Sequence, residues 1–111
     1  MADVSRPRVA AYVLRERTSW QLLVFEQDGN PDAGLQIPAG GVRTGETLTA
    51  AVLREVSEET GLTDLTIDHR LHTENSAHPE TGAARTTTYF VVNAAPTSPH
   101  AWMHRGARRR R

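Results

Sequence analysis

Short apolar runs separated by Asp-, Gly- and Pro-rich segments dominate the hydrophobic pattern of this chain. Runs of this length, rich in β-branched, aromatic and leucine residues, are typical of β-strands. The pattern predicts strands at residues 8–15, 20–26, 35–37, 65–73 and 86–93. Only a polar turn separates the first two, so we expect them to pair as a hairpin. In the last run, one of the neighbours Tyr89 and Phe90 should face the core, because successive strand residues point to opposite faces.

Two segments rich in turn-forming residues interrupt these strands. Residues 38–41 read Pro-Ala-Gly-Gly and predict a tight turn, in which glycine permits close backbone approach. Residues 74–85 contain Pro79 and Gly82 and predict a loop. From residue 94 onward the pattern predicts neither a helix nor a strand.

After the Pro-Ala-Gly-Gly turn the apolar spacing becomes helical and predicts a helix at about residues 47–60. Thr44 or Thr47 can supply the N-cap oxygen, and Gly61 suits the position just past the last turn. Strands, one helix and further strands predict a mixed sheet with a helix packed on it, an α/β (α+β) architecture. We expect one domain over residues 1–93 and a Pro-, His- and Arg-rich disordered tail over residues 94–111.

Composition narrows the class of protein. The 111 residues include no cysteine, which excludes disulfides and thiolate metal sites. No apolar run approaches the roughly 20 residues of a membrane span, and the N-terminus lacks an apolar signal core, so we expect no membrane partner and a cytoplasmic location. All 13 basic residues are arginine, and five of them lie in residues 101–111. Because aromatic residues do not interleave the terminal arginines, we expect a solvated tail and consider a nucleic-acid partner unfavoured.

Three carboxylates crowd the end of the predicted helix. Glu55 and Glu59 are four residues apart, so their like charges lie one above the other. Together with Glu58 they fall in the last two turns, where the helix dipole disfavours anions. A hard divalent cation, Mg²⁺ or Mn²⁺, is the partner that best suits clustered carboxylates. The alternative is an acidic surface helix with ordinary ion pairs, such as Arg54 with Glu58.

The helical face of these acids favours the metal site. At about 100° per residue, Glu55 and Glu59 fall within the apolar stripe of Val52 and Val56, and Glu58 lies beside it. A merely solvated acidic face would lie on the opposite side of the helix. The carboxylates are therefore expected to face inward.

The same segment resembles the signature of the Nudix hydrolases, G-x5-E-x7-R-E-U-x-E-E-x-G-U, where U is a bulky aliphatic residue. Every constrained position is matched here, by Gly40, Glu46, Arg54, Glu55, Val56, Glu58, Glu59, Gly61 and Leu62. The resemblance implies an α/β/α sandwich around a mixed sheet, with this segment forming a loop, a helix and a loop. It also implies a typical length greater than that of this chain, so the second, C-terminal helix is expected to be missing.

The resemblance implies a metal centre and its ligands. Glu55 and Glu59 would be ligands, and Glu58 would be a further ligand or the catalytic base. A backbone carbonyl at Ala39 or Gly40 would complete the shell. The implied cofactor is Mg²⁺ or Mn²⁺.

Further roles follow from the same resemblance. Glu46 and Arg54 would be a supporting pair that orients the carboxylates, and Gly61 would end the helix. In parts of the family the base lies on a later loop, where Glu74 and Glu80 are the candidates; each is also an ordinary surface residue.

The implied reaction is metal-dependent hydrolysis of the pyrophosphate linkage of a nucleoside diphosphate joined to another moiety. The alternative is a Nudix-like module that binds nucleotides but turns over poorly, because its C-terminal part is lost. A missing helix would leave apolar surface exposed, so a homodimer is also expected. Histidine metal sites are unfavoured, because His69 and His72, three apart in a strand, should point to opposite faces.

Overall fold

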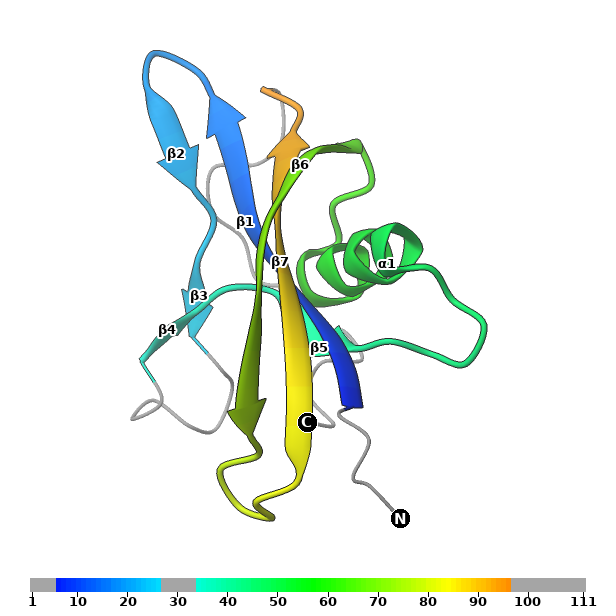
Figure 1. Cartoon of the computed structure of the whole chain (residues 1–111). Coiled ribbons are helices and arrows are strands. Elements are labelled where there is room, and N and C mark those ends of the chain that lie inside the picture. The colour runs from blue at the N-terminus through cyan, green and yellow to red at the C-terminus, as the bar shows by residue number, and fades with distance from the viewer. Residues whose placement is uncertain (1–5, 27–33, 97–111) are drawn as a thin grey trace.

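A computed structural model describes residues 6–26 and 34–96 (Figure 1). These residues form one helix and seven strands, and most of the strands belong to one central sheet. The strands are β1 (Arg6–Glu16), β2 (Trp20–Leu22), β3 (Phe25–Glu26), β4 (Leu35–Gln36), β5 (Ala39–Gly41), β6 (Leu65–Ala77) and β7 (Ala84–Ala94). The helix is α1 (Leu48–Thr60). The expected mixed architecture of strands and helix is confirmed, and the described residues contain α1 as their one helix.

The main sheet is mixed. Its strand order is β2-β1-β7-β6, and β5 pairs with a separate part of β1. β1 runs parallel to β7, with Val9 opposite Thr88, while the other pairings of this sheet are antiparallel. β3 and β4 form a small separate antiparallel sheet. The expected hairpin is confirmed by the pairing of β1 with β2.

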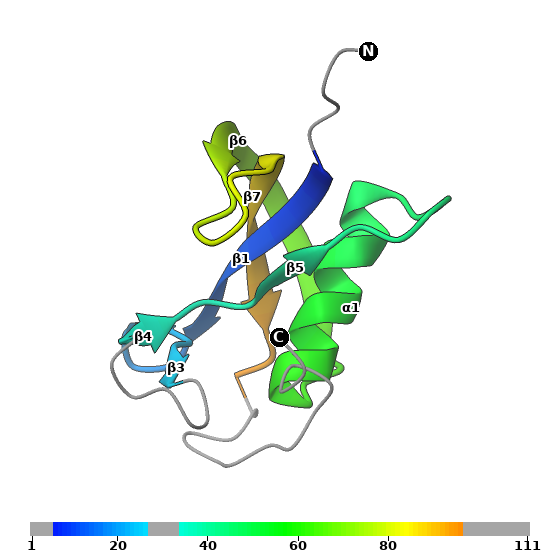
Figure 2. The same ribbon diagram turned by 90° about the horizontal axis from the view of Figure 1, so that it is seen from below.

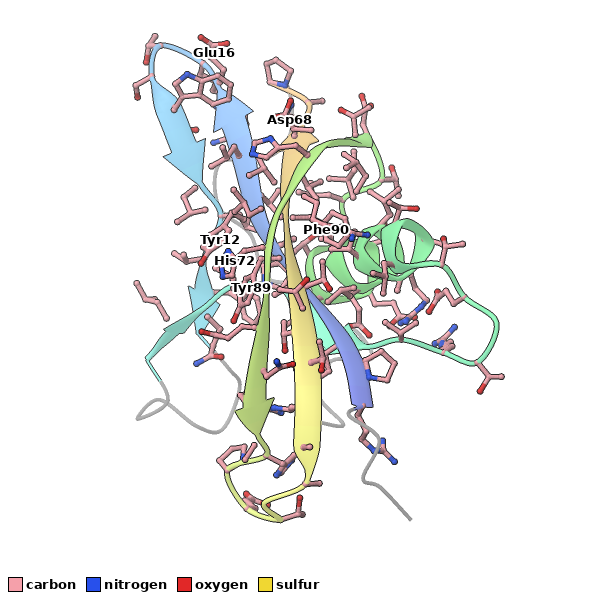
Figure 3. All side chains as sticks on the ribbon, in the orientation of Figure 1. Tyr12, Glu16, Asp68, His72, Tyr89 and Phe90 are labelled. Atoms are coloured by element: carbon pink, nitrogen blue, oxygen red, sulfur yellow. The ribbon has the colours of Figure 1, made fainter. Side chains whose placement is uncertain are left out.

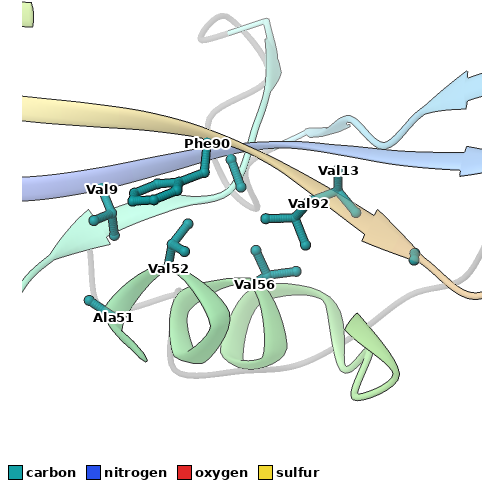
Figure 4. Packing of buried hydrophobic residues seen from close by; sticks show 9 residues of the cluster. Val9, Val13, Ala51, Val52, Val56, Phe90 and Val92 are labelled. Carbon is teal, nitrogen blue, oxygen red and sulfur yellow. The ribbon is translucent and has the colours of Figure 1, made fainter. Parts of the chain in front are cut away.

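Helix α1 covers one face of the main sheet, as Figure 2 shows from below. Because strand residues alternate between faces, every second residue of β1 and β7 points at the helix. Phe90 is 2% exposed and belongs to this core, whereas its neighbour Tyr89 lies on the other face, where its ring stacks with those of Tyr12 and His72 (Figure 3). The core consists mainly of Val9, Ala11, Val13, Ala51, Val52, Val56, Phe90 and Val92 (Figure 4).

Both ends of α1 are capped by the residues that the sequence indicated. Thr47 is extended and its Oγ1 accepts a hydrogen bond of 3.1 Å from the N–H of Ala50, which satisfies one donor of the first turn. Gly61 has φ 81° and donates its N–H to the carbonyl of Ser57. This left-handed conformation favours glycine, so the helix ends where the sequence changes.

Three of the expected boundaries are wrong. Residues 39–41 are not a turn but strand β5, which pairs with Arg8–Ala10. Residues 74–77 and 84–85 belong to β6 and β7, so the connecting turn is limited to residues 78–83. The expected strand 20–26 is divided into β2 and β3. Long-range pairing decides each of these cases, and local turn propensity does not record it.

His69 and His72 share a face of the sheet, contrary to the expectation from simple alternation. The register of β6 shifts between Ile67 and His69 and again between Arg70 and His72. The second shift places His72 opposite Tyr89 and on the same face as His69. A β-bulge adds one residue to a strand and so reverses the alternation beyond it.

Some expectations lie outside the described residues. Of the tail expected over residues 94–111, the structure describes only residues 94–96, of which Ala94 still belongs to β7. The expected loss of a C-terminal helix concerns this region and stays an expectation. Within the described part of the chain, no helix is long and apolar enough to cross a membrane.

Candidate metal and phosphate site at the end of helix α1

The site begins where β5 passes the carboxylates of α1. Gly40 is so close to Glu55 that a Cβ atom built on it would lie 2.1 Å from the Cδ atom of Glu55. Only glycine leaves room for this side chain. The glycine that the sequence placed in a tight turn therefore acts as one wall of a carboxylate pocket.

Glu55 is the most deeply buried acid of the site, at 4% exposure. Its Oε2 accepts a hydrogen bond of 2.9 Å from Nη1 of Arg54. Its Oε1 is buried and has no hydrogen-bond partner. Burying a carboxylate oxygen without a hydrogen-bond partner costs free energy, so we expect a ligand to bind Oε1 of Glu55.

Glu59 lies one turn further along α1 and is also buried, at 5% exposure. Its Oε1 accepts a hydrogen bond of 3.3 Å from the N–H of Ala39. Glu55 and Glu59 therefore face the same short strand, β5. The inward orientation that the helical period predicted for both is confirmed.

Arg54 ties the site together through all five of its N–H donors. Its Nε and Nη2 bind the two oxygens of Glu46 at 2.8 and 2.9 Å. Nη2 also donates to the carbonyl of Gly41 at 2.9 Å. Nη1 donates to Glu55 at 2.9 Å and to Glu58 at 3.3 Å. The guanidinium group of Arg54 thus connects β5, the loop between β5 and α1, and two carboxylates of the helix.

The contact between Glu46 and Arg54 shifts the pKa values of both groups. The hydrogen bonds from Arg54, assisted by the backbone N–H of Arg43, lower the pKa of Glu46 from 4.5 to about 2. The hydrogen bond with Glu46 raises the pKa of Arg54 above its ordinary value. Both groups are therefore charged over the whole physiological pH range, and the pair is available as a permanent scaffold.

Glu58 is more exposed than its two neighbours, with 25% of its side chain accessible. It pairs with Arg54 and also with Nη2 of Arg43, at 3.2 Å. The sequence reasoning missed Arg43, which precedes the helix on the connecting loop. Its side chain is 61% exposed, so this pair is a solvated contact.

The donors of the site suit a hard divalent cation. Among the described residues, no three His, Asp or Glu side chains are already arranged as a ligand set. The unpartnered Oε1 of Glu55 nevertheless supplies an oxygen of the kind that Mg²⁺ prefers. Glu59 and the backbone of residues 39–40 lie beside it. The residues present therefore fit the group that the sequence predicted.

The two later candidates for a base are not brought to this cluster. Glu74 pairs with Thr87 on the sheet face opposite α1, and its Oε1 accepts a hydrogen bond of 3.2 Å from the hydroxyl of Tyr89. Glu80 lies in the turn between β6 and β7, where its N–H donates to His78. Of the sequence candidates, Glu58 is the acid that the structure places next to Glu55 and Arg54.

Known proteins are similar to this chain in sequence. The model of the NUDIX domain matches residues 4–105. Nudix hydrolase 6 of Arabidopsis thaliana is 33% identical over 92 residues, which are 81% of this chain and 32% of that protein. The chain thus spans about a third of the length of this curated relative.

Solved structures show the same fold at low sequence identity. An Ap4A hydrolase of C. elegans has a TM-score of 0.67 and 21% identity over 90% of this chain and 74% of that chain. The dihydroneopterin triphosphate pyrophosphohydrolase of E. coli has a TM-score of 0.70 and 20% identity over 92% and 77% of the two chains. The NUDIX domain of Shewanella oneidensis NrtR, in complex with ADP ribose, has a TM-score of 0.68 and 17% identity over 93% and 69%.

Proposed function

Because this chain belongs to the Nudix family, we propose that it hydrolyses the pyrophosphate linkage of a nucleoside diphosphate derivative with the help of a divalent cation. The observation that carries the proposal is the buried, unpartnered Oε1 of Glu55, held against Gly40 and beside Glu59. Acids in this position can approach a phosphate only if a cation lies between them.

Glu55, Glu59 and a carbonyl of Ala39 or Gly40 would hold the cation, which is Mg²⁺ or Mn²⁺. When bound, the cation neutralises phosphate oxygens and lowers the pKa of a coordinated water. Oxygen ligands of this kind leave coordination positions for water and for substrate phosphates.

The side chains of the protein would orient the reacting groups and accept the proton of the attacking water. Arg54 holds Glu55 and Glu58 in place, and Glu46 holds Arg54 by two parallel hydrogen bonds. As a water oxygen attacks phosphorus and the bridging P–O bond breaks, Glu58, the most accessible carboxylate of the site, would take the proton. The bridging oxygen leaves with one phosphate product and the water oxygen stays with the other.

The substrate class rests on the neighbours of the fold. Ap4A, dihydroneopterin triphosphate and ADP ribose, which appear in the names of the similar structures, all contain phosphoanhydride bonds. The run Gln36-Ile37-Pro38-Ala39-Gly40 resembles the Pro-Ala-Gly segment of family members that act on ADP-ribose and nucleotide sugars, which favours nucleoside diphosphate derivatives. Together these points support a small-molecule nucleoside diphosphate derivative as substrate.

The test is turnover of a panel of nucleoside diphosphate derivatives by the pure chain in MgCl₂ and in MnCl₂. We expect phosphate-bearing products with the native protein and a loss of at least a hundredfold in Glu59→Gln, which is about 2.7 kcal/mol of transition-state stabilisation. Removal of the cation with EDTA should abolish turnover.

Glu16→Gln provides the matched control. Glu16 lies at the exposed end of β1, away from the site, and the same change of charge there should leave turnover intact. Nucleotide binding without turnover in the native chain would contradict hydrolysis and support the binding module.

A further inference from the structure

A second charged site has its arginine side chains on the face of the main sheet that α1 does not cover. A groove of about 720 Å³ opens there at the start of β1 and β7, and we name it the arginine groove. Its volume lies within the range of about 300–1,000 Å³ of small-molecule sites. The residues that give it its character are Arg6, Arg8, Arg85, His78, Thr81 and Gly41.

Strand alternation separates this groove from the carboxylates of α1. Val9 of β1 and Phe90 of β7 point at the helix, so Arg8 and Arg85 point to the opposite face. On β5, Gly40 faces Glu55, while the Cβ direction of Gly41 meets open space. The guanidinium groups of the groove and the carboxylate of Glu55 therefore lie on opposite faces of the sheet.

The charge of the groove is strongly one-sided. Three guanidinium groups line it, and no carboxylate is among the described residues that do so. Arg6 and Arg85 are paired across the parallel strands β1 and β7, which brings two like charges to one end of the sheet. Such an arrangement is unfavourable unless an anion offsets it.

Two nitrogen atoms of the groove, Nε of Arg85 and Nε2 of His78, can donate hydrogen bonds to a ligand. Nε of Arg85 is buried and has no hydrogen-bond partner. Nδ1 of His78 accepts hydrogen bonds from the N–H groups of Glu80 and Thr81, at 3.1 and 3.3 Å. Because Nδ1 is an acceptor, the proton of the neutral ring lies on Nε2, which is then a donor. These two nitrogens thus add hydrogen-bond donors to the guanidinium groups of the groove.

We propose that the arginine groove binds the phosphate group of a small molecule, at a site separate from the carboxylates of α1. Planar guanidinium groups bind phosphate through parallel hydrogen bonds, which suits a tetrahedral dianion. The inference does not rest on the proposed hydrolysis, because neither a cation nor Glu55 takes part in it.

The test is calorimetric titration of the full chain with sodium phosphate in buffer containing EDTA, so that no cation can recruit phosphate to α1. We expect saturable binding that Arg85→Gln weakens at least tenfold and that added salt weakens further. Glu59→Gln should bind phosphate as the native chain does. Absence of saturable binding, or equal binding by Arg85→Gln, would overturn the proposal.

Arg17→Gln is the matched control, because Arg17 lies beyond the other end of β1 and donates to the carbonyl of Pro96. It should bind phosphate normally; a loss as large as that of Arg85→Gln would overturn the proposal. All variants keep the arginines of residues 101–111, so their contribution is constant. If Arg85→Gln does not fold, as judged by circular dichroism, Arg6→Gln takes its place with the same expected loss.

A parallel titration with ribose 5-phosphate separates the two sources of the anion. Tighter binding of the ester than of inorganic phosphate identifies an organic phosphate as the ligand, and equal binding identifies the free ion. Either result supports the site if Arg85→Gln removes it.

Discussion

Gly40 determines where the carboxylate of Glu55 lies. A methyl group on Gly40 would lie 2.1 Å from Cδ of Glu55 and 2.2 Å from its Oε2, so one of the two groups must move. We expect Gly40→Ala to lower the free energy of unfolding by about 1–3 kcal/mol and to weaken Mn²⁺ binding at least tenfold. Chemical denaturation and calorimetric titration with MnCl₂ measure the two effects.

The neighbouring glycine offers a control for this change. A Cβ atom on Gly41 meets nothing within 4 Å, and the substitution keeps the carbonyl that Arg54 binds. We expect Gly41→Ala to change the free energy of unfolding by less than about 0.5 kcal/mol. Equal effects of the two substitutions would contradict the close approach of Gly40 and Glu55.

Glu46 makes the stability of the protein depend on acid pH. Its pKa is about 2 in the folded chain, against an ordinary 4.5, because Arg54 and the N–H of Arg43 stabilise the carboxylate. The lowered pKa stabilises the fold above about pH 4.5, and this contribution is lost as the pH falls toward 2.

The free energy of unfolding, measured by urea denaturation between pH 2 and pH 7, checks this dependence. We expect Glu46→Gln to lose part of the rise in stability that the native protein shows between pH 2 and pH 5. Glu16→Gln, in the exposed end of β1, is the comparison. A native and a Glu46→Gln protein with parallel curves would show that this carboxylate does not titrate abnormally.

The residues of the site were predictable to different degrees. The helical period placed Glu55 and Glu59 in the apolar stripe, and both are buried. Their roles as ligands stay predictions. The contact of Arg54 with the carbonyl of Gly41 could not be predicted, because it joins two elements whose approach depends on the fold. Arg43 was missed for the same reason.

At the scale of the elements, the hydroxyl group of Thr47 caps the N-terminus of α1. Thr47 is the N-cap, and its Oγ1 satisfies the N–H of Ala50. We expect Thr47→Ala to destabilise the protein by about 1 kcal/mol, as is usual for the loss of a cap. Thr47→Ser keeps the oxygen and should differ from the native protein by much less. Thermal unfolding followed by circular dichroism measures both, and similar midpoints for Thr47→Ala and the native chain would contradict the capping role.

The helix could be predicted more closely than the strands because its signals are local. Periodicity, an N-cap and a terminal glycine all lie within α1 and its flanks. The three residues of β5 form a strand only because β1 pairs with them, and their composition indicates a turn. Residues 74–77 extend β6 because β7 lies opposite them. Partners distant in sequence thus decided the elements that local patterns missed.

At the scale of the molecule, β6 forms one edge of the main sheet among the residues that the structure describes. It is 13 residues long, it pairs with β7 alone in the described part of the chain, and most of its residues are exposed. Leu71, at 44% exposure, lies where the register of this strand shifts. Long open edges promote pairing between chains, which supports the expectation of a homodimer.

We therefore expect self-association that increases with protein concentration, and less of it in Leu71→Lys, because a charge on an edge strand opposes pairing. Light scattering over a concentration series measures the mass of the particle. Ala50→Lys, at an exposed position of α1 and not on the edge strand, serves as comparison for the added charge alone. A constant monomer mass at all concentrations would contradict the expected dimer.

The two oxygens of the Glu55 carboxylate have different surroundings. Oε2 accepts a hydrogen bond from Arg54, and Oε1 has no hydrogen-bond partner. The proposed cation would therefore bind Oε1 and leave the hydrogen bond of Oε2 to Arg54 in place. Aspartate has the same charge but one carbon fewer, so it could not reach both Arg54 and the proposed cation from the same backbone position. Side-chain length, and not charge alone, is what natural variation at this position must preserve.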